Sequence, residues 1–180
     1  MAGYTDQQAK ISLELSQNAY CGHGHYLSHT YTGAASGFVA TKSLYSGIWQ
    51  DTEGFVGYLP SDSSIYVSFR GSLTIQNWIT DLSIAKTKYN SFPDCNCEVH
   101  SGFYGATMSV FPDVLAEVKR LQSLHKTYAV KVTGHSLGGA LAQLTSMELI
   151  KNGIHATMIN FGQPRVGDDA YAAYSNKKLT

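Results

Sequence analysis

A serine between glycines lies where the chain changes from one type of secondary structure to another. Ser136 stands in the motif Gly-His-Ser-Leu-Gly, residues 134–138, between an apolar run that begins at Tyr128 and a helical pattern that continues to Leu144. A strand, a sharp turn and a helix around G-x-S-x-G form a nucleophile elbow, which projects the serine hydroxyl from the end of a sheet. We therefore predict that Ser136 is the nucleophile of an acyl transfer, whereas the alternative is a glycine-rich helix start that contains a serine.

Acyl transfer also needs donors that receive the oxyanion and an oriented base that activates the serine. The backbone N–H of Leu137 would lie at a helix N-terminus, where amides can bind an anion. Ser72 follows the end of a strand in the sequence Phe-Arg-Gly-Ser, and both its N–H and its hydroxyl could point at an oxyanion. We therefore predict that Ser72 and Leu137 form the oxyanion hole; the alternative for Ser72 is an ordinary turn serine.

The first part of the chain predicts a helix followed by strands. A capping box of Thr5 and Gln8 begins a helix that extends to Tyr20. Residues 60–63 are typical of a turn, and the segment after it, Ser64 to Phe69, places apolar residues on one face. The segments with strand character are expected to form an antiparallel meander: 38–45, 52–58 and 64–69.

The second part predicts alternating helices and strands. Residues 102–124 are expected to be mostly helical, with an interruption near Phe111-Pro112. A strand before Ser136, a second strand at 156–161 and a last helix at 168–174 imply right-handed crossovers and parallel pairing. Joined to the meander, they predict an α/β fold with a mixed sheet and flanking helices, in a single domain over residues 1–180. Gly134 and Gly138 are needed because a side chain at either would clash in the tight turn.

Charge and composition restrict the classes of partner. The 180 residues carry 13 basic and 13 acidic side chains, which argues against nucleic acid or an anionic membrane held by charge alone. No apolar run is long enough to span a bilayer, and the N-terminus has no visible signal peptide. Either the protein is intracellular, or Met1 is an artificial start on a mature secreted chain, so the localisation stays open.

The cysteines allow more than one interpretation. Their number is three, so one has no partner within this chain if a bridge forms. Cys95 and Cys97 could pair with other cysteines or form a local bridge, and a partner for Cys21 could lie outside this sequence. Cys21 also begins a loop with three histidines that has ligand types for a metal, although incidental histidines in a flexible loop are the alternative: His23, His25 and His29.

Four long segments together resemble the fungal-type triacylglycerol lipases, also called class 3 lipases. Their order and rough spacing match that family from about Ile65 to Tyr174. The segments are VSFRGSLTIQNWITDL (67–82), VHSGFYGA (99–106), VTGHSLGGALAQL (132–144) and NFGQPRVGDDAYAAY (160–174). The resemblance implies the α/β-hydrolase fold, with Ser136 as the acylated serine and with Ser72 and Leu137 as the oxyanion hole.

The resemblance further implies a lid over residues 74–81, with Trp78 and Ile79 as lid or substrate contacts. Opening such a lid exposes apolar surface, which a lipid–water interface would offset. Asp81 would hydrogen-bond the Ser72 hydroxyl, and a surface aspartate is the alternative; for Trp78 the alternative is a buried anchor. No cofactor is implied, and the expected partner is a lipid or another ester.

The sequence departs from the family where the base should be. In these enzymes the triad follows the order Ser, Asp, His, and both later members come after the Gly-Gln-Pro-Arg-Val-Gly motif. No positions here match them, because Asp168 and Asp169 belong to the motif itself and His135 is expected to point away from Ser136. We therefore expect a C-terminally incomplete chain that lacks the last strands of the family.

Two functions follow as hypotheses. The first is a carboxylic ester hydrolase that acts on lipids through an acyl-enzyme on Ser136. The alternative is a truncated, catalytically inactive lipase-like protein that binds lipid or a partner. His100 lies in one of the matching motifs and is expected to support structure rather than to transfer protons.

Overall fold

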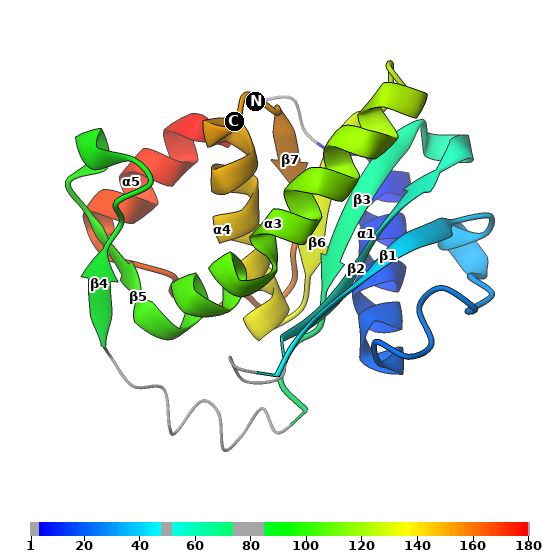
Figure 1. Cartoon of the computed structure of the whole chain (residues 1–180), viewed down its shortest axis with the longest axis horizontal. Coiled ribbons are helices and arrows are strands. Elements are labelled where there is room, and N and C mark those ends of the chain that lie inside the picture. Colours follow the sequence, from blue (N-terminus) through cyan, green and yellow to red (C-terminus); the bar gives the residue numbers. More distant parts are fainter. Residues whose placement is uncertain (1–3, 48–51, 74–84, 180) are drawn as a thin grey trace.

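A mixed β-sheet forms the centre of the protein (Figure 1). The structure is a computed structural model that describes residues 4–47, 52–73 and 85–179. In this part the main sheet has five strands in the order β1-β2-β3-β6-β7. Their bounds are β1 Val39–Ser46, β2 Thr52–Leu59, β3 Ser64–Phe69, β6 Ala129–Gly134 and β7 Ala156–Met158. The expected meander is confirmed in β1 to β3, and β6 and β7 add to it in parallel.

Helices cover both faces of the sheet. One face packs against α1 (Asp6–Asn18), and the other packs against α3 (Ser101–Leu124) and α4 (Leu137–Lys151). All six residues of β3 are therefore buried. The expectation of apolar residues on one face is right for Ile65, Val67 and Phe69, which lie in the core under α3 and α4. The opposite face is buried as well, because Tyr66 packs with the α1 cluster.

Side-chain hydroxyl groups on β3 and β6 form hydrogen bonds with α1. Ser68 on β3 donates to the backbone oxygen of Leu15 at 3.0 Å, and Thr133 on β6 donates to that of Ser12 at 3.1 Å. The Ser16 hydroxyl lies 2.8 Å from the Thr133 hydroxyl. The helix begins with the predicted capping box of Thr5 and Gln8. Buried hydrogen bonds thus fix α1 relative to the strands that precede Ser72 and Ser136.

The long helix α3 continues through Pro112, so the expected interruption is wrong. A proline removes one backbone hydrogen bond and leaves the carbonyl four residues earlier without its donor. Pro112 and Met108 both lie on the exposed side of the helix, where water can satisfy that carbonyl. His100 caps the helix, because its Nδ1 accepts from the Phe103 N–H, and this confirms its structural role. Although α3 has 24 residues, no helix in the described part is long and apolar enough to cross a membrane.

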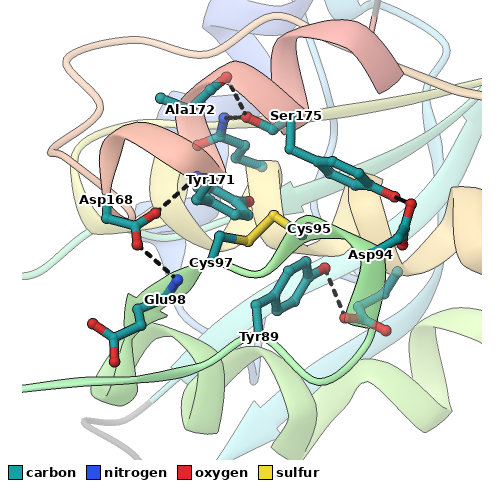
Figure 2. The surroundings of a disulfide bond; sticks show 12 residues. Tyr89, Asp94, Cys95, Cys97, Glu98, Asp168, Tyr171, Ala172 and Ser175 are labelled. Carbon is teal, nitrogen blue, oxygen red and sulfur yellow. Dashed lines mark hydrogen bonds between the residues drawn. A yellow bond between two sulfur atoms is a disulfide. The ribbon is translucent and has the colours of Figure 1, made fainter.

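A two-stranded sheet, which the sequence analysis did not predict, joins the C-terminal helix to the rest of the molecule (Figure 2). Its strands are β4 (Lys86–Lys88) and β5 (Glu98–His100), and the loop between them contains a disulfide between Cys95 and Cys97. Asp168 caps α5 (Asp169–Lys178) and also accepts from the Glu98 N–H at 3.0 Å. The helix extends beyond the predicted end at residue 174.

The cysteines and the short elements complete the described structure. The local bridge was one of the two alternatives for Cys95 and Cys97, and Cys21 is an exposed free thiol. Regular pairing in β7 ends at Met158, earlier than expected, although Phe161 still forms a bridge with His135. Single turns of 3₁₀ helix are Ala19–Cys21, Gly33–Ala35, Pro60–Asp62 and Pro93–Cys95.

The substitution Thr133→Val is expected to destabilise the protein by about 1–3 kcal/mol in denaturant unfolding. The shape of the side chain is kept, but buried groups on α1 lose their hydrogen-bond partner. Thr157→Val on the exposed side of β7 is the matched control, with an expected change within about 0.5 kcal/mol. Equal losses in the two variants would show that the hydroxyl contacts do not hold α1 in place.

Candidate active site

The turn between β6 and α4 has the backbone of a nucleophile elbow. Ser136 has φ 55° and ψ −123°, a region that residues with a side chain rarely adopt. Such a conformation costs on the order of 1–3 kcal/mol and persists only where the surroundings enforce it. The Ser136 N–H donates to the Phe161 oxygen at 2.9 Å, and His135 pairs with Phe161 beyond the end of β7. The turn is therefore held by the neighbouring parallel segment.

Close backbone contacts explain both glycines of the motif. A Cβ atom on Gly134 would lie well inside van der Waals contact of the Gly138 carbonyl group. A Cβ atom on Gly138 would collide with the Phe69 carbonyl oxygen at the end of β3. The steric role predicted for these two glycines is therefore confirmed. The contact at Gly138 places the start of α4 directly against the end of β3, the strand that leads to Ser72.

The Ser136 hydroxyl does not cap its own helix, although Ser136 occupies the N-cap position. The residue is only 6% exposed, and no hydrogen bond to its hydroxyl is found among the described residues. Leu137 is the first residue of α4, and its amide cannot bond within the helix. A buried hydroxyl beside a helix N-terminus is an arrangement that suits nucleophilic attack followed by stabilisation of an oxyanion.

The segment after β3 reaches the same place. A Cβ atom on Gly71 would lie 2.6 Å from the His135 oxygen and 3.3 Å from the Ser136 Cβ. Ser72, which follows, is partly buried. The structure thus brings the residue before Ser72 into contact with His135 and Ser136. Of the other residues singled out from the sequence, Trp78, Ile79 and Asp81 lie outside the described residues.

A buried ion pair, which the sequence analysis did not identify, fixes the chain just before Ser72. An Arg70 guanidinium nitrogen lies 2.8 Å from a Glu53 carboxylate oxygen, and the Arg70 N–H donates to the Glu53 backbone oxygen at 2.9 Å. The His23 N–H and the Tyr26 hydroxyl donate to the same carboxylate at 3.0 and 3.4 Å. Burial and the negative charge of Glu53 raise the pKa of Tyr26. The signal in the sequence was an acidic residue inside an apolar strand, which requires a partner when buried.

The histidines are placed elsewhere. The Nδ1 of His135 lies 2.8 Å from the Tyr20 hydroxyl, and His100 caps α3. His125 stacks on an aromatic ring before the start of β6, at the end opposite Ser136. None of them forms a hydrogen bond with the Ser136 hydroxyl within the described ranges. The remaining histidines lie in the loop after α1 or just before β7: His23, His25, His29 and His155.

The described residues, 4–47, 52–73 and 85–179, contain no candidate metal site. No group of three or more His, Cys, Asp or Glu side chains in these ranges could hold a metal ion. The cluster considered between Cys21 and His29 is therefore not formed. His23 instead contacts Glu53, with 3.1 Å between its Nδ1 and a carboxylate oxygen.

Comparison with known protein families gives one match over more than half of the chain. The family described as "Lipase (class 3)" matches residues 66–180. A lipase from Rhizomucor miehei is 35% identical over 168 residues, which cover 89% of this chain and 46% of that protein. Secreted mono- and diacylglycerol lipase 1 from Fusarium solani is 35% identical over 172 residues, with coverages of 92% and 51%. The chain thus spans about half the length of these curated relatives.

Solved structures give the same result for the fold. The native propeptide complex of Rhizomucor miehei lipase has a TM-score of 0.86 and 32% identity, and the match covers 97% of this chain and 59% of that one. A triacylglycerol lipase whose catalytic centre is formed by a serine protease triad has a TM-score of 0.87 and 32% identity, with coverages of 97% and 69%. The chain has the α/β-hydrolase fold of these fungal lipases, with a mixed sheet and flanking helices.

The substitution Gly134→Ala is expected to destabilise the protein by at least about 2 kcal/mol, because the added methyl group meets backbone atoms that cannot move aside. The matched control is Gly24→Ala, where an added Cβ meets nothing within 4 Å. Thermal unfolding of the two variants measures the difference. A midpoint for Gly134→Ala equal to that of the control would contradict the crowding of the elbow.

Proposed function

The chain belongs to the class 3 lipase family, and from this membership we propose that the protein hydrolyses carboxylic esters of lipids through an acyl-enzyme on Ser136. The observation that carries the proposal is the positive φ of Ser136 at the start of α4. The Ser136 oxygen attacks the ester carbonyl carbon, the alcohol leaves with a proton, and water then releases the acid from the acyl-serine. The reaction requires no cofactor.

The charge that develops on the ester carbonyl oxygen is received by the Leu137 amide and by Ser72. Two observations support this assignment. The Leu137 amide is the first of the helix and has no partner within it, and the dipole of α4 favours negative charge at that end. Gly71 lies against the His135 oxygen and the Ser136 Cβ. Ser72 is the next residue along the chain and is therefore close to the nucleophile. Preorganised donors of this kind lower the barrier because they need no reorientation during the reaction.

The base is not assigned to any histidine described here, since none forms a hydrogen bond with the Ser136 hydroxyl. Asp168 and Asp169 are also not assigned as the triad acid. Asp168 accepts hydrogen bonds from two backbone amides, and Asp169 pairs with Arg165 on the surface. Both aspartates thus have structural partners. The activity is proposed for the whole protein, because the chain spans about half the length of its curated relatives.

A lipid substrate is supported by the family match, and one large apolar residue is exposed beside Ser72. Leu73 is 70% exposed and directly follows the residue assigned to the oxyanion hole. We propose a lipid–water interface as the place of action, since an aggregated substrate offers the apolar contact that water does not.

The substitution Ser136→Ala tests this function. Hydrolysis of a tributyrin emulsion and of soluble p-nitrophenyl butyrate is expected to fall by at least about a thousandfold, because the nucleophile is removed. A fluorophosphonate probe is expected to label the unaltered protein at Ser136. Ser146→Ala is the matched control, since its hydroxyl lies on the same helix and bonds only to a backbone oxygen of that helix.

Two results would contradict the proposal. One is equal labelling of the protein and of Ser136→Ala, which would place the reactive group elsewhere. The other is a folded protein that binds lipid vesicles but shows neither labelling nor hydrolysis, which would favour a non-catalytic lipid-binding protein.

A further inference from the structure

Tyr20 lies in the single 3₁₀ turn that follows α1, at the same end of the sheet as Ser136. The helix before it is held to β3 and β6 by the hydroxyl groups of Ser68 and Thr133. These are the strands that lead to Ser72 and Ser136, respectively. Tyr20 is therefore carried by an element whose position is fixed relative to both halves of the candidate site.

The two halves meet in a contact that leaves no room for a side chain. Gly71 faces the His135 backbone oxygen, and an added Cβ would lie 2.6 Å from it. The same Cβ would collide with the Tyr20 hydroxyl oxygen. The hydroxyl thus lies directly against this contact between the chain before Ser72 and the chain before Ser136.

Tyr20 contacts both chains. Its hydroxyl oxygen lies 2.8 Å from the Nδ1 of His135 and directly against Gly71, where an added Cβ would collide with it. The phenol can donate its proton to Nδ1 when the ring proton of His135 is on Nε2. Burial raises the pKa of Tyr20, and the backbone of Gly71 and the positive charge of Arg70 oppose that rise. The phenol stays protonated at neutral pH and can donate.

From this geometry we propose that Tyr20 is a positioning residue for ester hydrolysis: its hydroxyl joins the residue before Ser72 to the residue before Ser136 and so fixes the oxyanion donors relative to the nucleophile. The inference rests on the proposed function. Tyr20 acts through Gly71 and His135, and no contact with substrate is required.

The physical reason is the precision that acyl transfer demands. The nucleophile and the oxyanion donors must hold the reacting atoms within a fraction of an ångström of the productive geometry. Ser72 lies beyond the end of β3, where regular strand pairing no longer determines the backbone position. The phenol hydroxyl contacts both chains across the gap. Without it, the direct contact between Gly71 and the His135 oxygen would lose the hydroxyl group that lies against it.

The substitution Tyr20→Phe tests the proposal, because it keeps the ring and removes only the hydroxyl. We expect kcat for soluble p-nitrophenyl butyrate to fall about tenfold with KM nearly unchanged, since positioning matters most in the transition state. The matched control is Tyr31→Phe, which removes a buried hydroxyl that donates to the Tyr26 backbone oxygen in the same N-terminal region. That variant is expected to change kcat by less than about twofold.

A second measurement on the same variants does not depend on activity. Amide hydrogen exchange followed by NMR is expected to accelerate in Tyr20→Phe at Gly71, Ser72 and Leu137, and to stay unchanged in the core strands. In Tyr31→Phe the amides of these three residues are expected to exchange as in the unaltered protein. If Tyr20→Phe changes exchange at these sites no more than Tyr31→Phe does, the proposal is wrong.

The two measurements separate the proposals. A selective change in exchange with the tenfold loss in kcat supports the role of Tyr20. If the unaltered protein has no esterase activity, the proposed function fails, while the exchange data still decide whether Tyr20 joins the two chains. If Tyr20→Phe and Tyr31→Phe show the same fall in kcat and the same loss of thermal stability, the positioning role is wrong.

Discussion

The candidate site depends on the contact between the backbone at Gly138 and the carbonyl oxygen of Phe69. No side chain fits between them, so the start of α4 and the end of β3 have one possible separation. The parallel pairing of β3 with β6 extends to Phe69 and Gly134, and it brings the two chains to this point in register. The unfavourable φ of Ser136 follows from the same constraint, because the chain must turn sharply from a strand into a helix that already touches its neighbour.

Polar contacts, rather than apolar packing alone, then decide how accurately the site is built. Two hydroxyl groups on neighbouring strands bond to α1, and a buried arginine and glutamate fix the segment beyond β3. Buried groups of this kind are costly to leave unpaired, so each one favours a single arrangement over near alternatives. The core determines which elements meet, and these bonds determine their relative position.

Much of the frame was predictable from the sequence because local signals and the fold agree there. The capping box at Thr5, the alternation in β3 and the strand–turn–helix around Ser136 are short-range patterns, and the structure contains all three. Pro112 was misjudged, since its cost depends on whether the freed carbonyl faces water, which only the packing of α3 decides. The pairing of β4 with β5 was missed because both strands are three residues long. The partners of Glu53 and Tyr20 are distant along the chain, and a single sequence does not reveal them.

The attachment of α1 has a consequence for the order in which the protein can fold. The bonds from this region to β6 and the elbow join residues that are 115 to 121 positions apart. Closing a loop of that size costs chain entropy before any contact compensates for it, and such distant pairings slow folding. The elbow glycines are close together in the sequence, but the completed site must wait for α1 to dock on strands that are made much later than α1. Assembly of the site is therefore a late event, and it reports on whether the whole described frame has formed.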